Sequence, residues 1–338
     1  MAATDDGAGS ARVEVRSSRL CLEHRPGLGH PDQPDRIQTV LSALEAPPDG
    51  GWKVVADSPL PPQDDVLGVL KWVHDADYIE RVRQAAASNA PWIDSHDCVV
   101  STGTFKAATA AVGLALQAAL DLANGRVDRV FVAGRPPAHH AERDRARGYC
   151  FFNTVAVAAE VIVRSWHQPV LIVDFDALHG NGTQRHFWER GDVGYLSVHR
   201  YPGFPGSGGG DEIGAGAGLG ATRNIPLAVG ADDALFCTAL ENGLEELAAR
   251  LEPAAVVVSA GFNGHEDDAI GELRMTASGY RRATLAVMHA ADRWARGRVL
   301  SFLEGGFAPE ALAASVRSHV EELSRFSLPA SNGSFPVN

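Results

Sequence analysis

The chain has 338 residues, of which 45% are hydrophobic and 21% are charged, an ordinary composition for a globular protein. Its formal net charge of −12 argues against a nucleic-acid partner, because nucleic-acid binding proteins present a basic face. The four cysteines form no CxxC pair, so neither a zinc ribbon nor a disulfide framework is indicated, and a reducing cytoplasm is the expected compartment.

The N-terminal segment does not predict a secretory signal, and no membrane-spanning segment is expected. The first residues include acids and lack an apolar core, so they do not resemble a secretory signal. We expect no apolar run of the roughly 20 residues that a transmembrane helix needs, and therefore no membrane partner. The expected organisation is a flexible N-terminus over 1–18, one domain over 19–325 and a C-terminal tail over 326–338.

Predicted helices and strands alternate through the chain. They are, in order, a helix at 107–123, a strand at 130–133, a helix at 154–165, and strands at 170–173, 194–199, 255–258 and 299–303. Strands that alternate with helices predict a mostly parallel sheet covered by helices on both faces. The expected fold class is therefore α/β, in a single domain.

Polar residues follow three of the predicted strands. Asp174 and Asp176 follow the first, Asn263 follows the second, and Glu304 follows the third. In open α/β sheets, chemistry collects at the carboxyl ends of the strands. A metal hydrolase would need three protein ligands and an open coordination position there. Asp176 would be a good ligand and Asn263 a poor one, so the sequence predicts an incomplete metal site.

Two adjacent histidines, His139 and His140, follow another predicted strand and a Pro-Pro turn. Neighbouring imidazoles can divide the work of proton transfer, one charged as the acid and one neutral as the base. An isolated pair of this kind is more commonly part of a surface loop. Asp174 and Asp176 share one face of their strand and need a cation, a histidine or a proton to balance their charge. Asn181 could orient an imidazole by hydrogen bonding.

The ordered series of motifs resembles the histone deacetylase and acetylpolyamine amidohydrolase family. The motifs are RPPAHHA, GYCFFN, DFDALHGNG, SVHRYPGFPGSG, SAGFNGHEDDAIGELRMT and FLEGGF, and the segment 23–36 resembles the family's opening segment. The resemblance extends from about residue 20 to about residue 318. It implies the arginase/deacetylase fold, with an eight-stranded parallel sheet and a narrow tunnel that reaches the ends of the strands.

The resemblance also implies roles for single residues. His139 and His140 match the family's acid/base pair. Asp174 matches the carboxylate that orients the first histidine, and Asn181 matches a polar partner of the second. The residues expected to contact the substrate are Gly148, Tyr149, Leu178, Phe204, Asn263, Ile270 and Phe307. Asp174 and Ser197 match side chains of the family's potassium site, so a structural potassium ion is possible.

Three positions depart from the family pattern at the metal and the oxyanion. Asp176 matches the first zinc ligand, but the zinc histidine falls on Leu178 and the second zinc aspartate on Asn263. The tyrosine that polarises the scissile carbonyl falls on Phe307. Leucine cannot ligate a metal, and a neutral amide offers only a weak oxygen ligand. Bound zinc is therefore not expected.

Three explanations compete for these departures. The chain could be a zinc-dependent deacetylase or amidohydrolase inactivated by substitution, a catalytically dead binding protein, or an enzyme repurposed for metal-independent chemistry. The scaffold motifs, the two histidines and Asp174 persist while only the metal and oxyanion groups are lost, which favours the third explanation. The expected reaction is elimination, isomerisation, cyclisation or intramolecular attack on an elongated small molecule in bacterial biosynthesis, and a homodimer is left open.

Overall fold

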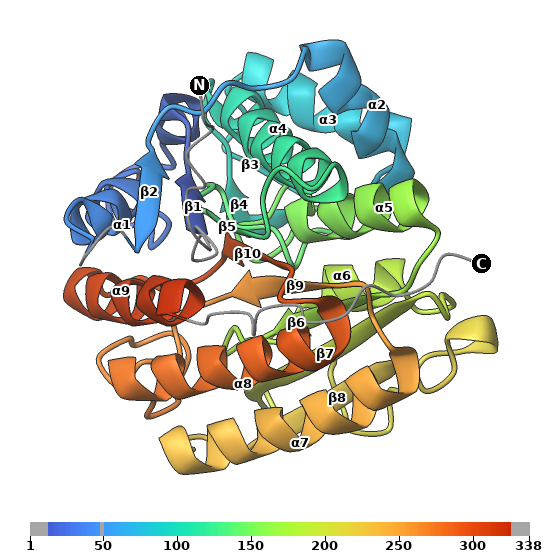
Figure 1. The fold of residues 1–338 in the computed structure, drawn as a ribbon. Helices are drawn as coiled ribbons and strands as arrows, with labels where there is room; N and C mark the ends of the chain where they lie inside the picture. The colour runs from blue at the N-terminus through green and yellow to red at the C-terminus, as the bar shows by residue number, and fades with distance from the viewer. Residues whose placement is uncertain (1–12, 48–50, 326–338) are drawn as a thin grey trace, which may run out of the picture.

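The structure is a computed structural model that describes residues 13–47 and 51–325 (Figure 1). Eight of its strands form one sheet in the spatial order β2-β1-β5-β10-β9-β6-β7-β8. Their bounds are β1 Val13–Arg16, β2 Trp52–Val55, β5 Arg129–Val132, β6 Val170–Asp174, β7 Val193–Arg200, β8 Thr222–Leu227, β9 Ala255–Ala260 and β10 Val299–Leu303. Every neighbouring pair in this sheet is parallel, as the sequence predicts.

Helices cover both faces of the sheet (Figure 1). The helices are α1 Asp35–Leu44, α2 Gln63–Val73, α3 Ala76–Ala87, α4 Thr104–Ala123, α5 Thr154–Trp166, α6 Asn181–His186, α7 Asp233–Leu251, α8 Ala277–Ala295 and α9 Pro309–Arg325. One apolar cluster joins the sheet to α2, α3, α4 and α5, and a second joins it to α1, α7, α8 and α9. The predicted two-faced architecture is therefore confirmed.

Helix α4 differs from the sequence-based expectation about membranes. By length and composition alone it is apolar enough to cross one, although no such segment was expected. In the structure, 78% of its most apolar window is buried, and the helix packs against α5 and α2. Packing within the domain accounts for its apolar character.

The sheet begins earlier than predicted. Strand β1 lies within the segment 1–18 that was expected to be flexible, yet Val13 and Val15 are fully buried. The strand pairs with β2 on one side and with β5 on the other. The predicted domain start at residue 19 is therefore too late. Residues 1–12 and the predicted tail at 326–338 lie outside the described part of the chain.

The sheet order brings the polar strand ends together. Strand β9 lies between β10 and β6, and Asp174 at the end of β6 is in register with Ser259 of β9. Strand β5 lies on the other side of β10 and leads to the two histidines. Since all of these strands run in the same direction, the segments that follow them meet at one edge of the sheet.

Candidate active site

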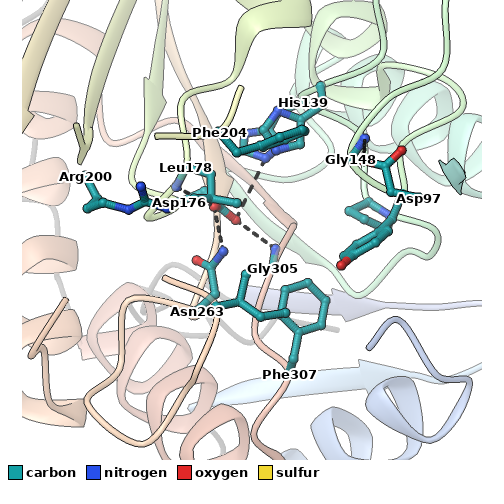
Figure 2. A pocket seen from close by; sticks show the side chains of 14 residues that line it. Asp97, His139, Gly148, Asp176, Leu178, Arg200, Phe204, Asn263, Gly305 and Phe307 are labelled. Carbon is teal, nitrogen blue, oxygen red and sulfur yellow. Dashed lines mark hydrogen bonds and ion pairs between the residues drawn. The ribbon is translucent and has the colours of Figure 1, made fainter. Parts of the chain in front are cut away.

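A pocket of about 230 Å³ opens at this edge of the sheet (Figure 2). His139, His140 and Asp176 lie on its surface. So do all the residues predicted to contact a substrate, which are Gly148, Tyr149, Leu178, Phe204, Asn263, Ile270 and Phe307. The volume is below the roughly 300–1,000 Å³ of sites for drug-sized ligands, so the pocket fits a small or narrow group.

His139 lies between two buried carboxylates. Its Nδ1 is 3.0 Å from Oδ2 of Asp174, and its Nε2 is 3.9 Å from Oδ2 of Asp176. Burial lowers the pKa of His139, but Asp174, Asp176 and Glu304 outweigh burial and raise the pKa to about 10. The pKa of the Asp174 carboxyl lies above its usual value, because the effect of burial exceeds the opposing effect of His139. His139 is therefore suited to carry a proton near neutral pH.

His140 has a different environment. Its Nδ1 is 2.9 Å from Oδ1 of Asn181, and Nδ2 of Asn181 donates to Oε1 of Glu142 at 2.8 Å. Burial lowers the pKa of His140 well below its usual value, and the charge of His139 lowers it further. The centroids of the two imidazole rings are only 3.9 Å apart. Neighbouring groups whose pKa values are pushed apart can serve as acid and base in one site.

Glu304 binds the backbone of the segment that carries the histidines, a role that was not predicted from the sequence. Its Oε2 accepts hydrogen bonds from the backbone N–H groups of Ala138 at 2.6 Å and His139 at 3.2 Å. Ser259 Oγ donates to the other carboxylate oxygen at 3.2 Å. Burial raises the pKa of the Glu304 carboxyl to about 7. The signal that could have identified Glu304 is its position directly after a buried strand.

The carboxylate of Asp176 is held by protein donors (Figure 2). Its Oδ1 accepts from the backbone N–H of Leu178 at 2.9 Å and from Nδ2 of Asn263 at 2.8 Å. Its Oδ2 accepts from the backbone N–H of Gly305 at 2.9 Å. The amide oxygen of Asn263 accepts from the backbone N–H of Ala177 at 3.0 Å, which fixes the orientation of the amide.

These residues do not fit the zinc ion that the family resemblance implies. Leu178 has no ligand atom, and Asn263 turns its N–H group, not its oxygen, toward Asp176. Within residues 13–47 and 51–325, no group of three or more His, Cys, Asp or Glu side chains is arranged to hold a metal ion. The side chains instead form an internally hydrogen-bonded floor.

Aromatic rings form much of the wall around this floor. The ring of Phe204 lies edge-on to His140, with centroids 5.0 Å apart. Phe307 lies edge-on to Tyr149 at 5.8 Å, and the guanidinium of Arg36 lies 4.7 Å from the Phe307 ring centroid. Phe307 presents an apolar ring to the pocket, at the position where the family resemblance implies a hydroxyl group.

The side chains predicted for a potassium site lie next to one another. Asp174 of β6 and Ser197 of β7 are in register on neighbouring strands. Ser197 Oγ is 2.8 Å from Nδ1 of His199, and the hydroxyl of Tyr195 donates to Oδ2 of Asp174 at 3.0 Å. The potassium ion stays a prediction.

Four further residues line the pocket without having been predicted: Asp97, Pro137, Arg200 and Gly305. Oδ2 of Asp97 accepts from the backbone N–H of Gly148 at 3.0 Å. Arg200 pairs with Glu272 at 3.1 Å. Pro137, Arg200 and Gly305 fall within the quoted motifs and could have been included, whereas Asp97 lies in the hairpin strand β4 (Ser95–Val99), outside them.

Comparisons with known proteins find a family profile and similar chains. Residues 30–323 match the family profile described as "Histone deacetylase domain". The chain is 30% identical to a "Histone deacetylase-like amidohydrolase" of Pseudomonas aeruginosa, over 88% of this chain and 77% of that protein. It is 29% identical to a "Probable deacetylase" of Archaeoglobus fulgidus, over 86% of this chain and 79% of that protein.

A plant relative and a solved structure extend the comparison. The chain is 32% identical to "Histone deacetylase 15" of Arabidopsis thaliana over 87% of its own length, and it spans about half, 52%, of that relative. The crystal structure of the HDA15 HD domain superposes with a TM-score of 0.85 at 30% identity, covering 94% of this chain and 90% of that one.

Proposed function

The chain belongs to the histone deacetylase family, and from this premise we propose that it is a metal-independent enzyme that carries out acid–base chemistry. In this proposal His140 accepts a proton from the substrate, and His139, held by Asp174, donates one. The substrate is an elongated small molecule that enters the pocket between Tyr149 and Phe204. Elimination, isomerisation, cyclisation and intramolecular attack rearrange bonds within the substrate, and each is assisted when a base removes a proton at one atom while an acid protonates another, such as the leaving group of an elimination.

The observation that carries the proposal is the contrast within one pocket. The neighbouring carboxylates raise the pKa of His139, whereas burial and the charge of His139 lower the pKa of His140. At the same time, Asn263 donates to Asp176 at the position where the family resemblance implies a metal. A charged imidazole beside a neutral one supplies a proton donor and a proton acceptor in one pocket, which supports proton-transfer chemistry.

Comparison of the metabolites in cells with and without the gene tests the proposal. We expect one small molecule to accumulate when the gene is absent, and the purified protein to convert it after dialysis against a chelator. His139→Gln and His140→Gln should each abolish conversion while the variants stay folded. Tyr149→Ala, which removes a wall of the pocket, is the matched control for substrate binding.

The same experiment separates an enzyme from a binding protein. If the histidine variants restore the normal metabolite pattern while Tyr149→Ala does not, the pocket only binds its ligand and the proposal is wrong. If conversion requires added zinc, the metal-independent part of the proposal fails.

A further inference from the structure

His140 can accept a proton only at a ring nitrogen that does not already carry one. Burial lowers the pKa of its imidazole well below the usual value, so the ring is neutral. A neutral imidazole has one proton, on Nδ1 or on Nε2, and the other nitrogen is the base. Nδ1 of His140 lies 2.9 Å from Oδ1 of Asn181. Nε2 has no partner among the hydrogen bonds of residues 13–47 and 51–325, so the tautomer with the proton on Nδ1 leaves Nε2 free to act as the base.

The amide of Asn181 could favour either tautomer, depending on which way it faces. Its oxygen accepts from an Nδ1–H group, whereas its Nδ2, if the amide turned over, would donate to Nδ1 and favour the proton on Nε2. Two acceptors decide the direction. Nδ2 of Asn181 donates to Oε1 of Glu142 at 2.8 Å and to the backbone carbonyl of His140 at 3.3 Å. The amide oxygen is therefore left facing the ring of His140.

The backbone of Glu142 is held on both sides. Its N–H donates to the carbonyl of Arg145 at 2.9 Å, and its own carbonyl lies 2.8 Å from Nδ1 of His74. Burial lowers the pKa of His74 to about 3, so that ring is neutral too. Nε2 of His74 accepts from the backbone N–H of Asn153 at 2.9 Å, so the proton is on Nδ1 and is donated to Glu142. The Glu142 carboxylate is therefore placed by a buried framework.

We propose that Glu142 is a positioning residue that sets the tautomer of His140 through the amide of Asn181. Glu142 is not among the residues that line the pocket of the two histidines, and it lines a surface groove of about 840 Å³ together with Asn181 and Glu189. The expected effect on rate rests on the proposed function, because His140 is the base of that reaction. The effect on the position of the proton needs no substrate.

The chemistry of a carboxylate suits this role. A carboxylate only accepts hydrogen bonds, so it makes the nitrogen of the Asn181 amide face it, whereas an ammonium group only donates and would make the oxygen face it. Pairing with Arg185 at 3.5 Å does not account for the arrangement, because the Arg185 side chain is 75% exposed and exposed ion pairs contribute little. The contact with Asn181 is the better protected one, since the Glu142 side chain is only 12% exposed and Asn181 only 7%.

Nuclear magnetic resonance of the full chain with nitrogen-15 in its histidines tests the proposal directly. A ring nitrogen without a proton resonates well downfield of one that carries a proton, and the signals of His140 are identified by their loss in His140→Gln. We expect Nδ1 protonated and Nε2 unprotonated, with this tautomer favoured at least about tenfold because one hydrogen bond supports it. The measurement uses the unaltered protein, so it does not depend on a variant that folds.

Variants of Glu142 separate its hydrogen bond from its charge. Glu142→Lys should reverse the ratio of the tautomers and lower kcat more than about tenfold, while KM changes less than about twofold because residue 142 does not line the pocket. Glu142→Gln keeps an acceptor without the charge and should retain the ratio within about twofold. Glu189→Leu, the matched control, removes an exposed carboxylate from the same groove and should change neither the ratio nor kcat.

The proposal is overturned if Nε2 carries the proton in the unaltered protein, if Glu142→Lys leaves the ratio unchanged, or if Glu142→Gln loses the preference. Turnover that requires His140 but is indifferent to Glu142→Lys would refute the role of Glu142 and leave the proposed enzyme standing. The expected tautomer in a protein that turns over no substrate would refute the proposed enzyme and leave the role of Glu142 standing.

Discussion

The histidine pair and the floor of the pocket around Asp176 balance charge in different ways. Asp174, which is 3.0 Å from His139, and the other nearby carboxylates push His139 toward its charged form. Burial and the charge of His139 push His140 toward its neutral form. On the floor, Asp176 is surrounded by N–H donors from the protein itself. The histidine pair can therefore donate and accept a proton, whereas the floor is a fixed hydrogen-bond network.

This difference shows how a buried carboxylate can be balanced by hydrogen-bond donors of the protein. A buried carboxylate needs a compensating partner, and hydrogen-bond donors can serve in place of a cation. The amide of Asn263 supplies such a donor, and Leu178 fills space with apolar atoms while its backbone N–H supplies another. A leucine at 178, an asparagine at 263 and the histidine pair are therefore compatible within one folded site.

The largest expected effect comes from the histidine side. Asp174→Asn should reduce turnover on the order of 10³-fold, because the imidazole loses the carboxylate that orients and charges it. The pKa of His139, raised to about 10 in the present protein, should fall when this anion is removed. The acid form of His139 is lost as pH rises through its pKa, so the alkaline limb of the pH–rate profile should move to lower pH. Rates measured across pH check both effects.

Zinc binding by the unaltered protein and by a variant of the floor tests whether Asp176 is balanced without a metal ion. After mild dialysis, elemental analysis should find well under one zinc per chain in the unaltered protein. The double variant Leu178→His with Asn263→Asp supplies an imidazole and a second carboxylate beside Asp176, and it should bind about one zinc per chain. A chelator should then lower the melting temperature of the double variant alone. Stoichiometric zinc in the unaltered protein would contradict our interpretation of the floor.

The stability of the floor can be measured directly. Asp176→Ala should lower the free energy of unfolding by about 3–5 kcal/mol, because it leaves the donors of Leu178, Asn263 and Gly305 without an acceptor. Urea unfolding followed by circular dichroism gives this value. Ile270→Ala, at the pocket wall, is the control for loss of side-chain volume at the site. A cost below about 1 kcal/mol would show that the network is not an important source of stability.

The smallest expected effect is that of replacing Asn181, the hydrogen-bond partner of His140. Asn181→Ala removes a neutral partner of His140 and should reduce turnover only about tenfold, because an uncharged amide orients the imidazole without changing its charge. The ratio of the two effects is the useful quantity. If Asn181→Ala costs as much as Asp174→Asn, the division of the pair into acid and base is wrong.

Part of the fold and of the site could be predicted because the signals are local. Continuous apolar runs identify β6, β9 and β10, and the polar residues directly after them identify the candidate site. Strand β1 was missed because four residues are too few for a clear periodic signal, and its burial depends on the neighbours β2 and β5. Asp97 was missed because it belongs to a hairpin with no catalytic pattern of its own.

The sequence by itself determined the parallel α/β architecture, the histidine pair and the absence of ligands at 178 and 263. Only the tertiary structure decided how these residues are paired. Asn263 contacts Asp176 across 87 positions of sequence, and Glu304 reaches the backbone of Ala138 across 166. Neither contact follows from local pattern, because each depends on β9 and β10 lying between β6 and β5 in the sheet. The direction in which the Asn263 amide turns is fixed there too, by the backbone N–H of Ala177 and the carboxylate of Asp176.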